Sequence, residues 1–341
     1  MTDPKGLDLS TLRSFLDRAR PGLVSGELTG ELIPGGKSNL TYRVADDAQR
    51  WVVRRPPLGH VLSTAHDMSR EYRVISALGG TRVPVPGTVA LCEDPEVIGA
   101  PFYVMEHVDG TVWRTAGQTA TLGAERVGSL SLALMDVLAD LHAVDPAAVG
   151  LGDFGKPEGY LARQLRRWST QLQHSHNREL PGLAELHDDL VARMPAQATQ
   201  VSILHGDYRL DNCIVGPGDQ IVAVLDWEMA TIGDPLADLG LFLCYWRMWT
   251  EPVMEGLFGD PPPPGIFPTS AQMAARYAAR RGADLSELPW YVAFAHYKLV
   301  GILEGIHYRY LAGQTVGEGF DRVGAMVPHL IKLGHRTLQE A

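Results

Sequence analysis

A polar cluster framed by short apolar segments is the feature that most constrains this chain. The cluster opens with HGDYRLDN at residues 205–212 and continues with DWE at residues 226–228. Short segments with strand-like composition precede and separate its parts, at residues 203–204, 213–215 and 221–225. Such segments place polar side chains at strand ends and in loops, where sites are usually built. We therefore expect the chemistry of the protein to lie here.

The spacing within this cluster indicates phosphoryl transfer. Asp207 and Asn212 reproduce the D-x-x-x-x-N spacing of kinase catalytic loops, in which the Asp accepts the proton of the attacking hydroxyl and the Asn binds metal. Asp226 ends the next apolar strand and offers a second hard oxygen ligand for Mg²⁺. Asp and Asn also commonly close loops through bonds to the backbone. The joint pattern favours the functional interpretation.

The first third of the chain has the periodicity of an antiparallel sheet. Residues 30–44 read as a strand, a glycine turn and a second strand, and residues 51–54 as a third. Residues 69–78 have helical spacing, and residues 97–107 predict a further strand. We place the end of this small antiparallel β lobe at residue 108.

The rest of the chain, residues 109–341, is expected to be mainly helical. Leu130, Leu134, Leu138 and Leu141 recur at the spacing of a helix with one buried face. The proline run at residues 261–264 lacks backbone donors and predicts a loop. The fold class is therefore α+β, with a small antiparallel β lobe followed by a larger helical lobe, and the kinase-type spacing of Asp207 and Asn212 implies that the two lobes are arranged as in protein kinases.

Composition excludes several classes of protein. A formal net charge of -10 argues against general nucleic-acid binding. No stretch approaches the roughly 18 apolar residues of a membrane span, and no apolar leader begins the chain. The 3 cysteines lie far apart and suggest neither a disulfide framework nor a metal knuckle. We expect a cytoplasmic protein that binds no nucleic acid and no membrane, and the sequence leaves its oligomeric state open.

Several motifs together resemble those of the aminoglycoside phosphotransferase-like kinases, a family that includes choline, homoserine and macrolide kinases. The resemblance covers about residues 35–310. Within this family, the motifs most resemble the branch whose kinase-like domain is fused, in some proteins, to acyl-CoA dehydrogenases. The motifs that carry it are SNLTYRV, VVRRPP, AHDMSREYRVISAL, HGDYRLDN and DWEMATIGDPLADL.

This resemblance implies roles for five residues. Asp207 would be the catalytic base, and Asn212 and Asp226 would bind magnesium. His205 and Asp238 would support the catalytic loop structurally rather than touch substrate. Glu228 is a further possible ligand or a solvated carboxylate.

The expected phosphate clamp departs from the usual kinase pattern. Kinases pair a strand lysine with a helix glutamate, whereas the corresponding strand here offers Arg54, with Glu71 in the following helix as its partner. A guanidinium can hold phosphate through two hydrogen bonds. The alternative is that Arg54 and Arg55 form a solvated strand end.

Two other segments are expected to contact the nucleotide. The glycine turn would cover the phosphates, because glycine lets backbone N–H groups approach oxygen. The segment from Met105 to Val108 would be a hinge that recognises adenine through its backbone. The residues involved are Gly35, Gly36, Ser38, Asn39, Glu106 and Val108.

The sequence therefore predicts an ATP- and Mg²⁺-dependent phosphotransferase that acts on a hydroxyl of a small molecule. The narrower resemblance favours a hydroxyacyl-CoA or hydroxy acid as acceptor, and the broader one an aminoglycoside or other antibiotic. Because the strand lysine is missing, a nucleotide-binding pseudokinase is the alternative from another class. A metal-dependent hydrolase is weaker, since the histidines lack ligand spacing. The choice between ATP and GTP stays open.

Overall fold

The computed structural model describes residues 3–34, 39–58, 67–175, 177–196, 200–251, 262–315 and 319–340. The chain divides into two units. The first combines residues 1–111 with 213–217 and 222–230, and the second holds the remaining residues 112–212, 218–221 and 231–341. The division at residue 108 between a nucleotide-binding and a catalytic lobe stays a prediction.

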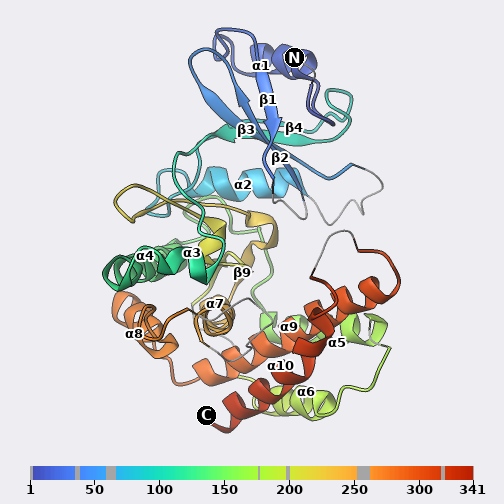
Figure 1. Ribbon diagram of the computed structural model, residues 1–341, viewed down its shortest axis with the longest axis vertical. Helices are drawn as coiled ribbons and strands as arrows, with labels where there is room; N and C mark the ends of the chain where they lie inside the picture. The colour runs from blue at the N-terminus through green and yellow to red at the C-terminus, as the bar shows by residue number, and fades with distance from the viewer. Residues whose placement is uncertain are drawn as a thin grey trace. The chain divides into compact units, whose positions relative to one another are not determined.

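A five-stranded antiparallel sheet is the framework of the first unit (Figure 1). Its order is β1-β2-β3-β5-β4, so that β3 lies at the centre. This confirms the antiparallel sheet expected from the sequence. The strands are β1 (Thr29–Leu32), β2 (Leu40–Ala45), β3 (Arg50–Arg55), β4 (Thr88–Cys92) and β5 (Phe102–Glu106).

The strand expected over residues 97–107 is shorter than its apolar composition suggested. Only β5 is extended, because the preceding residues form a turn in which the Gly99 nitrogen donates to the Pro95 carbonyl at 2.7 Å. Gly99 has a φ of 84°, a left-handed conformation that favours glycine. The apolar residues before Phe102 therefore belong to a loop.

Two helices with polar caps accompany this sheet. α1 (Leu9–Ala19) begins at Asp8, whose side chain accepts from the Thr11 nitrogen. α2 (Met68–Leu78) begins at Asp67, which accepts from the Arg70 nitrogen at 2.9 Å. These caps satisfy backbone donors that have no partner inside a helix. Side chains from α1 and the sheet share one apolar core, which includes Leu12, Leu16, Tyr42, Trp51, Val53, Phe102 and Val104.

Two later segments of the chain complete the first unit. β7 (Cys213–Val215) pairs with β8 (Ile221–Val224), and Val215 exchanges backbone hydrogen bonds with Thr111 at 2.8 and 2.9 Å. The Val224 nitrogen donates to the Pro84 carbonyl at 2.8 Å. The short helix η2 (Trp227–Met229) follows β8. Residues more than 100 positions apart thus build one sheet-based unit.

The second unit is mainly helical, as expected. The helix predicted from the leucine spacing is α4, and it is fully formed. α9 packs on α7 and on α10, and α4 packs on α8. The helices are α3 (Ala116–Ala120), α4 (Ala124–Ala143), α5 (Tyr160–Ser175), α6 (Leu183–Ala192), α7 (Pro235–Thr250), α8 (Ser270–Arg281), α9 (Leu288–Leu311) and α10 (Val323–Gln339).

A small two-stranded sheet precedes the polar cluster in this unit. β6 (Ser202–Leu204) pairs antiparallel with β9 (Thr231–Gly233). α7 starts directly after β9, where Asp234 caps it by accepting from the Leu236 nitrogen at 3.0 Å and Pro235 occupies the first turn. The strand ends therefore fix both the loop that follows β6 and the helix that follows β9.

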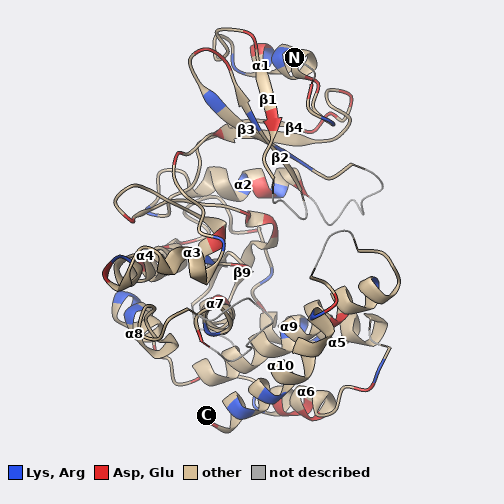
Figure 2. Ribbon diagram, in the orientation of Figure 1, with Lys and Arg blue, Asp and Glu red and all other residues tan. Residues whose placement is uncertain are grey.

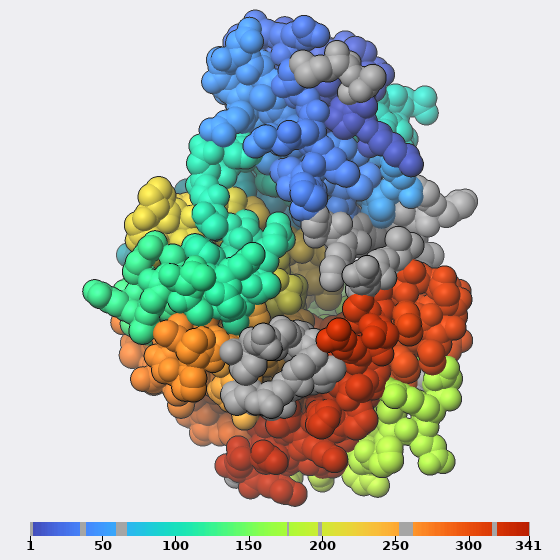
Figure 3. Space-filling model, in the orientation of Figure 1, coloured from blue at the N-terminus to red at the C-terminus, as the bar shows by residue number. Residues whose placement is uncertain are grey.

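Charged side chains join elements of the second unit at its surface. Arg276 and Arg280 of α8 pair with Asp136 and Asp140 of α4. Figure 2 marks basic positions on the ribbon of α8 in blue. In the space-filling view, the green surface of α3 and α4 adjoins the orange surface of α8 (Figure 3). Of the helices in the described ranges, none combines the length and apolar character that crossing a bilayer requires.

Candidate functional site

The loop after β6 is held by one buried carboxylate. Asp238 on α7 accepts from the backbone nitrogen of His205 at 2.6 Å and from that of Gly206 at 2.8 Å. Gly206 has a φ of 83°, which any side chain would strain. The sharp bend that begins the loop therefore depends on glycine and on Asp238.

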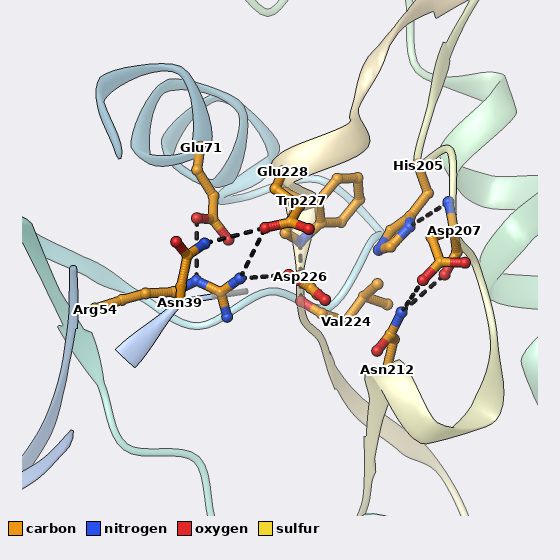
Figure 4. A network of polar contacts seen from close by, with 10 residues as sticks. All are labelled: Asn39, Arg54, Glu71, His205, Asp207, Asn212, Val224, Asp226, Trp227 and Glu228. Atoms are coloured by element: carbon orange, nitrogen blue, oxygen red, sulfur yellow. Dashed lines mark hydrogen bonds and ion pairs between the residues drawn. The ribbon is translucent and has the colours of Figure 1, made fainter. Parts of the chain in front are cut away.

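The side chains of Asp207 and Asn212 meet on this loop. The Asn212 Nδ2 donates to the Asp207 carbonyl at 2.8 Å and to its Oδ2 at 3.2 Å (Figure 4). The short helix η1 (Leu210–Asn212) brings the two residues together. Because these bonds use the amide nitrogen, the Asn212 amide oxygen is the atom able to face a cation. The Asp207 side chain keeps 26% of its surface exposed and can be reached by a ligand.

The His205 side chain lies in the protein interior and contacts the backbone of the loop. Its ring is fully buried, and its Nδ1 accepts from the Asp207 nitrogen at 3.2 Å. This bond assigns the Nδ1 as acceptor and therefore the proton to Nε2 in a neutral ring. The contact is the kind that a structural role requires, and that role stays a prediction.

The support of the loop extends behind Asp238. His142 lies 3.4 Å from the Asp238 carboxylate through Nε2 and 2.7 Å from the Tyr277 hydroxyl through Nδ1. Burial acts to raise the pKa of Asp238, but the bonds from His142 and His205 outweigh it and lower that pKa. Asp238 is 3% exposed, as a residue that supports the loop without touching a ligand would be, and that role stays a prediction.

Two cations and a phenol surround the Asp207 loop. The half-buried Lys298 donates to the Gly206 carbonyl at 3.1 Å, and burial lowers its pKa. Arg209 lies 3.7 Å from Asp207 and 3.1 Å from Asp211, and its guanidinium stacks over the Tyr245 ring with a separation of 4.9 Å. Burial and the neighbouring Asp207 carboxylate raise the pKa of Tyr245 well above 10. Two positive charges and a neutral phenol thus border the loop that carries Asp207.

In the first unit, Arg54 is the centre of a second network (Figure 4). Its Nε donates to Glu71 at 3.1 Å, its Nη2 pairs closely with Asp226, and Glu228 lies 3.8 Å away. Burial opposes the charge of Arg54, yet these carboxylates raise its pKa. Arg54 is 12% exposed and Arg55 only 4%. The alternative of a solvated strand end is therefore wrong for both arginines.

Glu71 lies at the buried end of this network. Its side chain is 1% exposed, and burial raises its pKa to about 7 although the guanidinium of Arg54 opposes the rise. The Arg54–Glu71 pairing expected from the sequence is present. Its use as a clamp for phosphate stays a prediction.

Asp226 has an unusual backbone. Its φ of 65° and ψ of 59° lie in the left-handed region, which residues other than glycine adopt at some cost in free energy. The next residue, Trp227, is 1% exposed and donates from its indole to the Val224 carbonyl at 3.0 Å. The turn is thus anchored by a buried indole, and it leaves 30% of the Asp226 side chain exposed.

Glu228 is tied into the protein. Its Oε2 accepts from the Asn39 Nδ2 at 3.0 Å. The alternative of a solvated carboxylate is therefore wrong, while a role as metal ligand stays a prediction. Asn39 itself is 2% exposed, and this bond connects the residue directly before β2 to the segment that carries Asp226.

Five other residues are expected from the sequence to bind the nucleotide. Gly35, Gly36 and Ser38 lie outside the described residues. Glu106 is the exposed end of β5, and its backbone nitrogen already donates to the Gly87 carbonyl at 2.8 Å. Val108 is half-buried beyond β5. The assignment of all five residues to nucleotide binding stays a prediction.

Sequence reasoning missed the aromatic residues beside the catalytic loop. Phe242, Tyr245, Trp246 and Trp249 line a pocket together with Arg209. They recur at i, i+3, i+4 and i+7 on one helix face. That stripe was visible in the sequence, but the same pattern usually marks a buried core, so that only the structure assigns it to a pocket.

The donor set fits magnesium rather than a softer metal. Among the described residues, no three His, Cys, Asp or Glu side chains are grouped as a metal cage. Mg²⁺ is usually held by one or two carboxylates and completed by nucleotide phosphates and water. Asn212 and Asp226 each carry a side-chain oxygen of this kind, and their use as magnesium ligands stays a prediction.

Comparison with curated proteins places this chain beside larger ones. It is 34% identical over 342 residues to acyl-CoA dehydrogenase family member 11 of Rattus norvegicus, covering 97% of this chain and 44% of that protein. It is 31% identical to the probable acyl-CoA dehydrogenase IBR3 of Arabidopsis thaliana, covering 87% of this chain and 38% of that one. The chain thus spans less than half the length of these relatives.

Solved structures show the same fold at full length. A Ralstonia eutropha protein with a provisional assignment as an aminoglycoside phosphotransferase superposes with a TM-score of 0.86 at 33% identity, covering 98% of this chain and 99% of that one. A thermostable mutant of the aminoglycoside phosphotransferase APH(4)-Ia, solved with AMP-PNP and hygromycin B, gives a TM-score of 0.62 at 15% identity, covering 96% of this chain and 98% of that one. The second likeness concerns the fold alone.

These comparisons confirm the kinase-like α+β fold and the resemblance to aminoglycoside phosphotransferases and to the acyl-CoA dehydrogenase-linked branch. The family model described as the phosphotransferase enzyme family matches residues 29–291, which is most of the chain. The protein therefore belongs to the phosphotransferase enzyme family.

Proposed function

We propose that the protein is an ATP- and Mg²⁺-dependent phosphotransferase that acts on a hydroxyl group of a small molecule. The observation that carries this proposal is the Asp207–Asn212 pair, fixed on one loop by the 3.2 Å bond between their side chains. A kinase needs such a carboxylate to orient the attacking hydroxyl and to accept its proton.

Magnesium would supply positive charge to the transferring phosphoryl group when it is bound. The Asn212 amide oxygen and the Asp226 carboxylate are the proposed protein ligands. Because Asp226 is paired with Arg54, metal would have to compete with that guanidinium for the carboxylate. Arg54 would then be available to the phosphates, where a guanidinium can donate two hydrogen bonds.

For the acceptor, we propose a hydroxyacyl-CoA or a hydroxy acid. The curated relatives carry the name acyl-CoA dehydrogenase, and in them the matching region belongs to a longer chain. An acyl-CoA chemistry in the same polypeptide favours an acyl acceptor for the kinase-like region. The rival is an antibiotic, because the solved likenesses include aminoglycoside and macrolide phosphotransferases.

The pseudokinase is the alternative from another class. It was motivated by the missing strand lysine. Arg54, already paired with Glu71 at 3.1 Å, supplies a cation in that position. The missing lysine is therefore a weaker argument for a pseudokinase. The retained Asp207, Asn212 and Asp226 also favour catalysis.

The test measures ADP release from Mg-ATP with a panel of hydroxyacyl-CoA thioesters, hydroxy acids, choline, homoserine, macrolides and aminoglycosides. Asp207→Asn is the blank, because an amide cannot accept the hydroxyl proton. Acceptor-dependent ADP that disappears in this variant supports the proposal. ATP binding without turnover on any acceptor supports the pseudokinase instead.

A further inference from the structure

A pocket of about 300 Å³ lies within the second unit, directly beside the catalytic loop. One wall is the loop itself, from Arg209 to Asp211, and another is the aromatic face of α7. The third comes from Arg114 and Thr115, just before α3. A volume of this size is typical of sites for small organic ligands.

Two wall residues connect this pocket to the proposed base. Arg209 lies 3.7 Å from the Asp207 carboxylate, and Asp207 is near enough to Tyr245 to raise the pKa of its phenol. The stacking of Arg209 over Tyr245, at 4.9 Å, joins the two walls. A molecule in the pocket would thus have Asp207 at its edge.

The wall formed by α7 is largely aromatic. The rings of Phe242 and Trp246 stack at 5.6 Å, and Trp249 follows at 6.0 Å from Trp246. Trp246 is 3% exposed and forms the base, while Tyr245 and Trp249 are half-buried. Such surfaces gain free energy by covering an apolar or aromatic body.

The two arginines of the pocket differ in their contacts with other residues. Arg209 is already engaged by Asp207, Asp211 and Tyr245. Arg114 is exposed, and in the part of the chain that the structure describes its guanidinium makes no hydrogen bond or ion pair. It lies close enough to Asp211 to oppose the rise that burial causes in the pKa of that carboxyl. Arg114 is therefore the cation that a ligand can engage.

We infer that this pocket binds the acceptor, and that it selects a molecule with an apolar body, a hydroxyl that reaches Asp207 and one anionic group on Arg114. This inference rests on the proposed function. In the reaction, the acceptor oxygen forms a bond to the γ-phosphorus while its proton passes to Asp207. The bond from the γ-phosphorus to the bridging oxygen breaks, and ADP leaves with that electron pair.

The same features disfavour polycationic acceptors. An aminoglycoside would need several carboxylates, whereas the one acidic residue among the pocket residues, Asp211, is already paired with Arg209 at 3.1 Å. A second ammonium group would also approach Arg114. The repulsion between this ammonium group and the Arg114 guanidinium opposes binding.

The experiment uses three acceptors of equal length with a terminal hydroxyl: hydroxyoctanoate, octanediol and aminooctanol. We expect kcat/KM to be highest for hydroxyoctanoate and at least tenfold lower for aminooctanol. Arg114→Ala should lower kcat/KM for hydroxyoctanoate about tenfold. The kcat/KM for octanediol, which has no anionic group, should not change. Trp249→Ala should lower both by a similar factor, because it removes shared apolar contact.

The matched control is Arg336→Ala, which removes an exposed arginine of α10 outside this pocket and should change no acceptor. Equal turnover of the three acceptors, or a loss with octanediol in Arg114→Ala as large as that with hydroxyoctanoate, would overturn the inference. Turnover of kanamycin that is indifferent to Arg114 and Trp249 would also overturn it while sparing the proposed function.

Binding separates the two proposals if no ADP is released. Calorimetry with hydroxyoctanoate and Asp207→Asn in the presence of Mg-ADP gives the dissociation constant without chemistry. Binding that weakens about tenfold when Arg114→Ala is added supports the pocket and counts against phosphotransfer. Absence of binding for all three compounds overturns the pocket.

Discussion

Asp238 accepts a hydrogen bond from the backbone nitrogen of His205 at 2.6 Å, which joins the start of the catalytic loop to a helix that begins after another strand. The carboxylate also accepts from Gly206 and contacts His142. The position of Asp207 therefore depends on a residue that never meets substrate.

We predict that Asp238→Ala lowers the free energy of unfolding by about 3 kcal/mol, because it leaves buried donors without an acceptor. Urea unfolding measures this loss, and kcat should fall together with it. Asp238→Asn keeps one acceptor oxygen and should lie between the alanine variant and the parent. An alanine variant as stable as the parent would contradict the role given to this carboxylate.

Arg54 has two roles that mutation can separate. Arg54→Ala should raise the KM for ATP at least tenfold, since a charge-assisted contact to phosphate is lost. It should also lower the free energy of unfolding by about 3 kcal/mol, because Glu71 loses its buried partner.

A double variant is the control. In Arg54→Ala with Glu71→Gln, the buried carboxylate is absent, so most of the stability should return while the KM for ATP stays high. If the KM also returns to that of the parent, Arg54 does not contact the nucleotide. Steady-state kinetics and urea unfolding of the same preparations decide between these outcomes.

His296 predicts a pH-dependent loss of stability. Burial on α9 lowers its pKa from 6.5 to about 4, so that the folded protein holds it neutral while the unfolded chain protonates it near 6.5. Its stabilising contribution is complete above pH 6.5 and is lost as the pH falls toward 4. The loss amounts to about 3 kcal/mol.

His296→Leu removes this titration. Between pH 7 and pH 4 its free energy of unfolding should fall less than that of the parent, as measured by urea unfolding at several pH values. His174→Leu, at an exposed position on α5, is the matched control and should retain the slope of the parent. Identical slopes for His296→Leu and the parent would show that another group causes the acid sensitivity.

Gly240 allows α7 and α9 to approach closely. A Cβ atom at this position would lie 2.7 Å from the Tyr291 carbonyl carbon and 2.8 Å from its oxygen. Gly240→Ala should therefore lower the free energy of unfolding by about 2 kcal/mol. Gly128→Ala, inside α4, meets no atom within 4 Å and should stabilise the protein by about 0.5 kcal/mol or more. Thermal unfolding of the two variants gives opposite shifts, and a shift of the same sign in both would contradict the packing argument.

Local patterns in the sequence predicted much of the fold. The spacing of Leu130, Leu134 and Leu138 identifies α4 because a helix face is defined within a few residues. β4 escaped prediction, since a five-residue strand is defined mainly by its pairing with β5. Residues 97–101 were wrongly included in a strand, because the Gly99 nitrogen donates within a turn to Pro95 and only Ile98 among these residues is buried.

The site was predicted where its logic is local. Asp207 and Asn212 are five positions apart, and the structure brings their side chains to 3.2 Å. The contacts Asn39–Glu228 and Arg54–Asp226 join residues more than 170 positions apart, and no pattern along the chain specifies them. Such pairs follow from the folded sheet and could not be read from one sequence.

The first unit is completed only by residues 213–217 and 222–230, and this has a consequence for synthesis in the cell. A ribosome that adds roughly 5–20 residues each second needs on the order of ten seconds to proceed from Thr111 to Val222. During that interval Arg54 on β3 and Glu71 on α2 are present without Asp226. The amino-terminal strands therefore remain incomplete until residues 213–217 and 222–230 have been synthesised. This interval is the one in which we expect a chaperone to bind them.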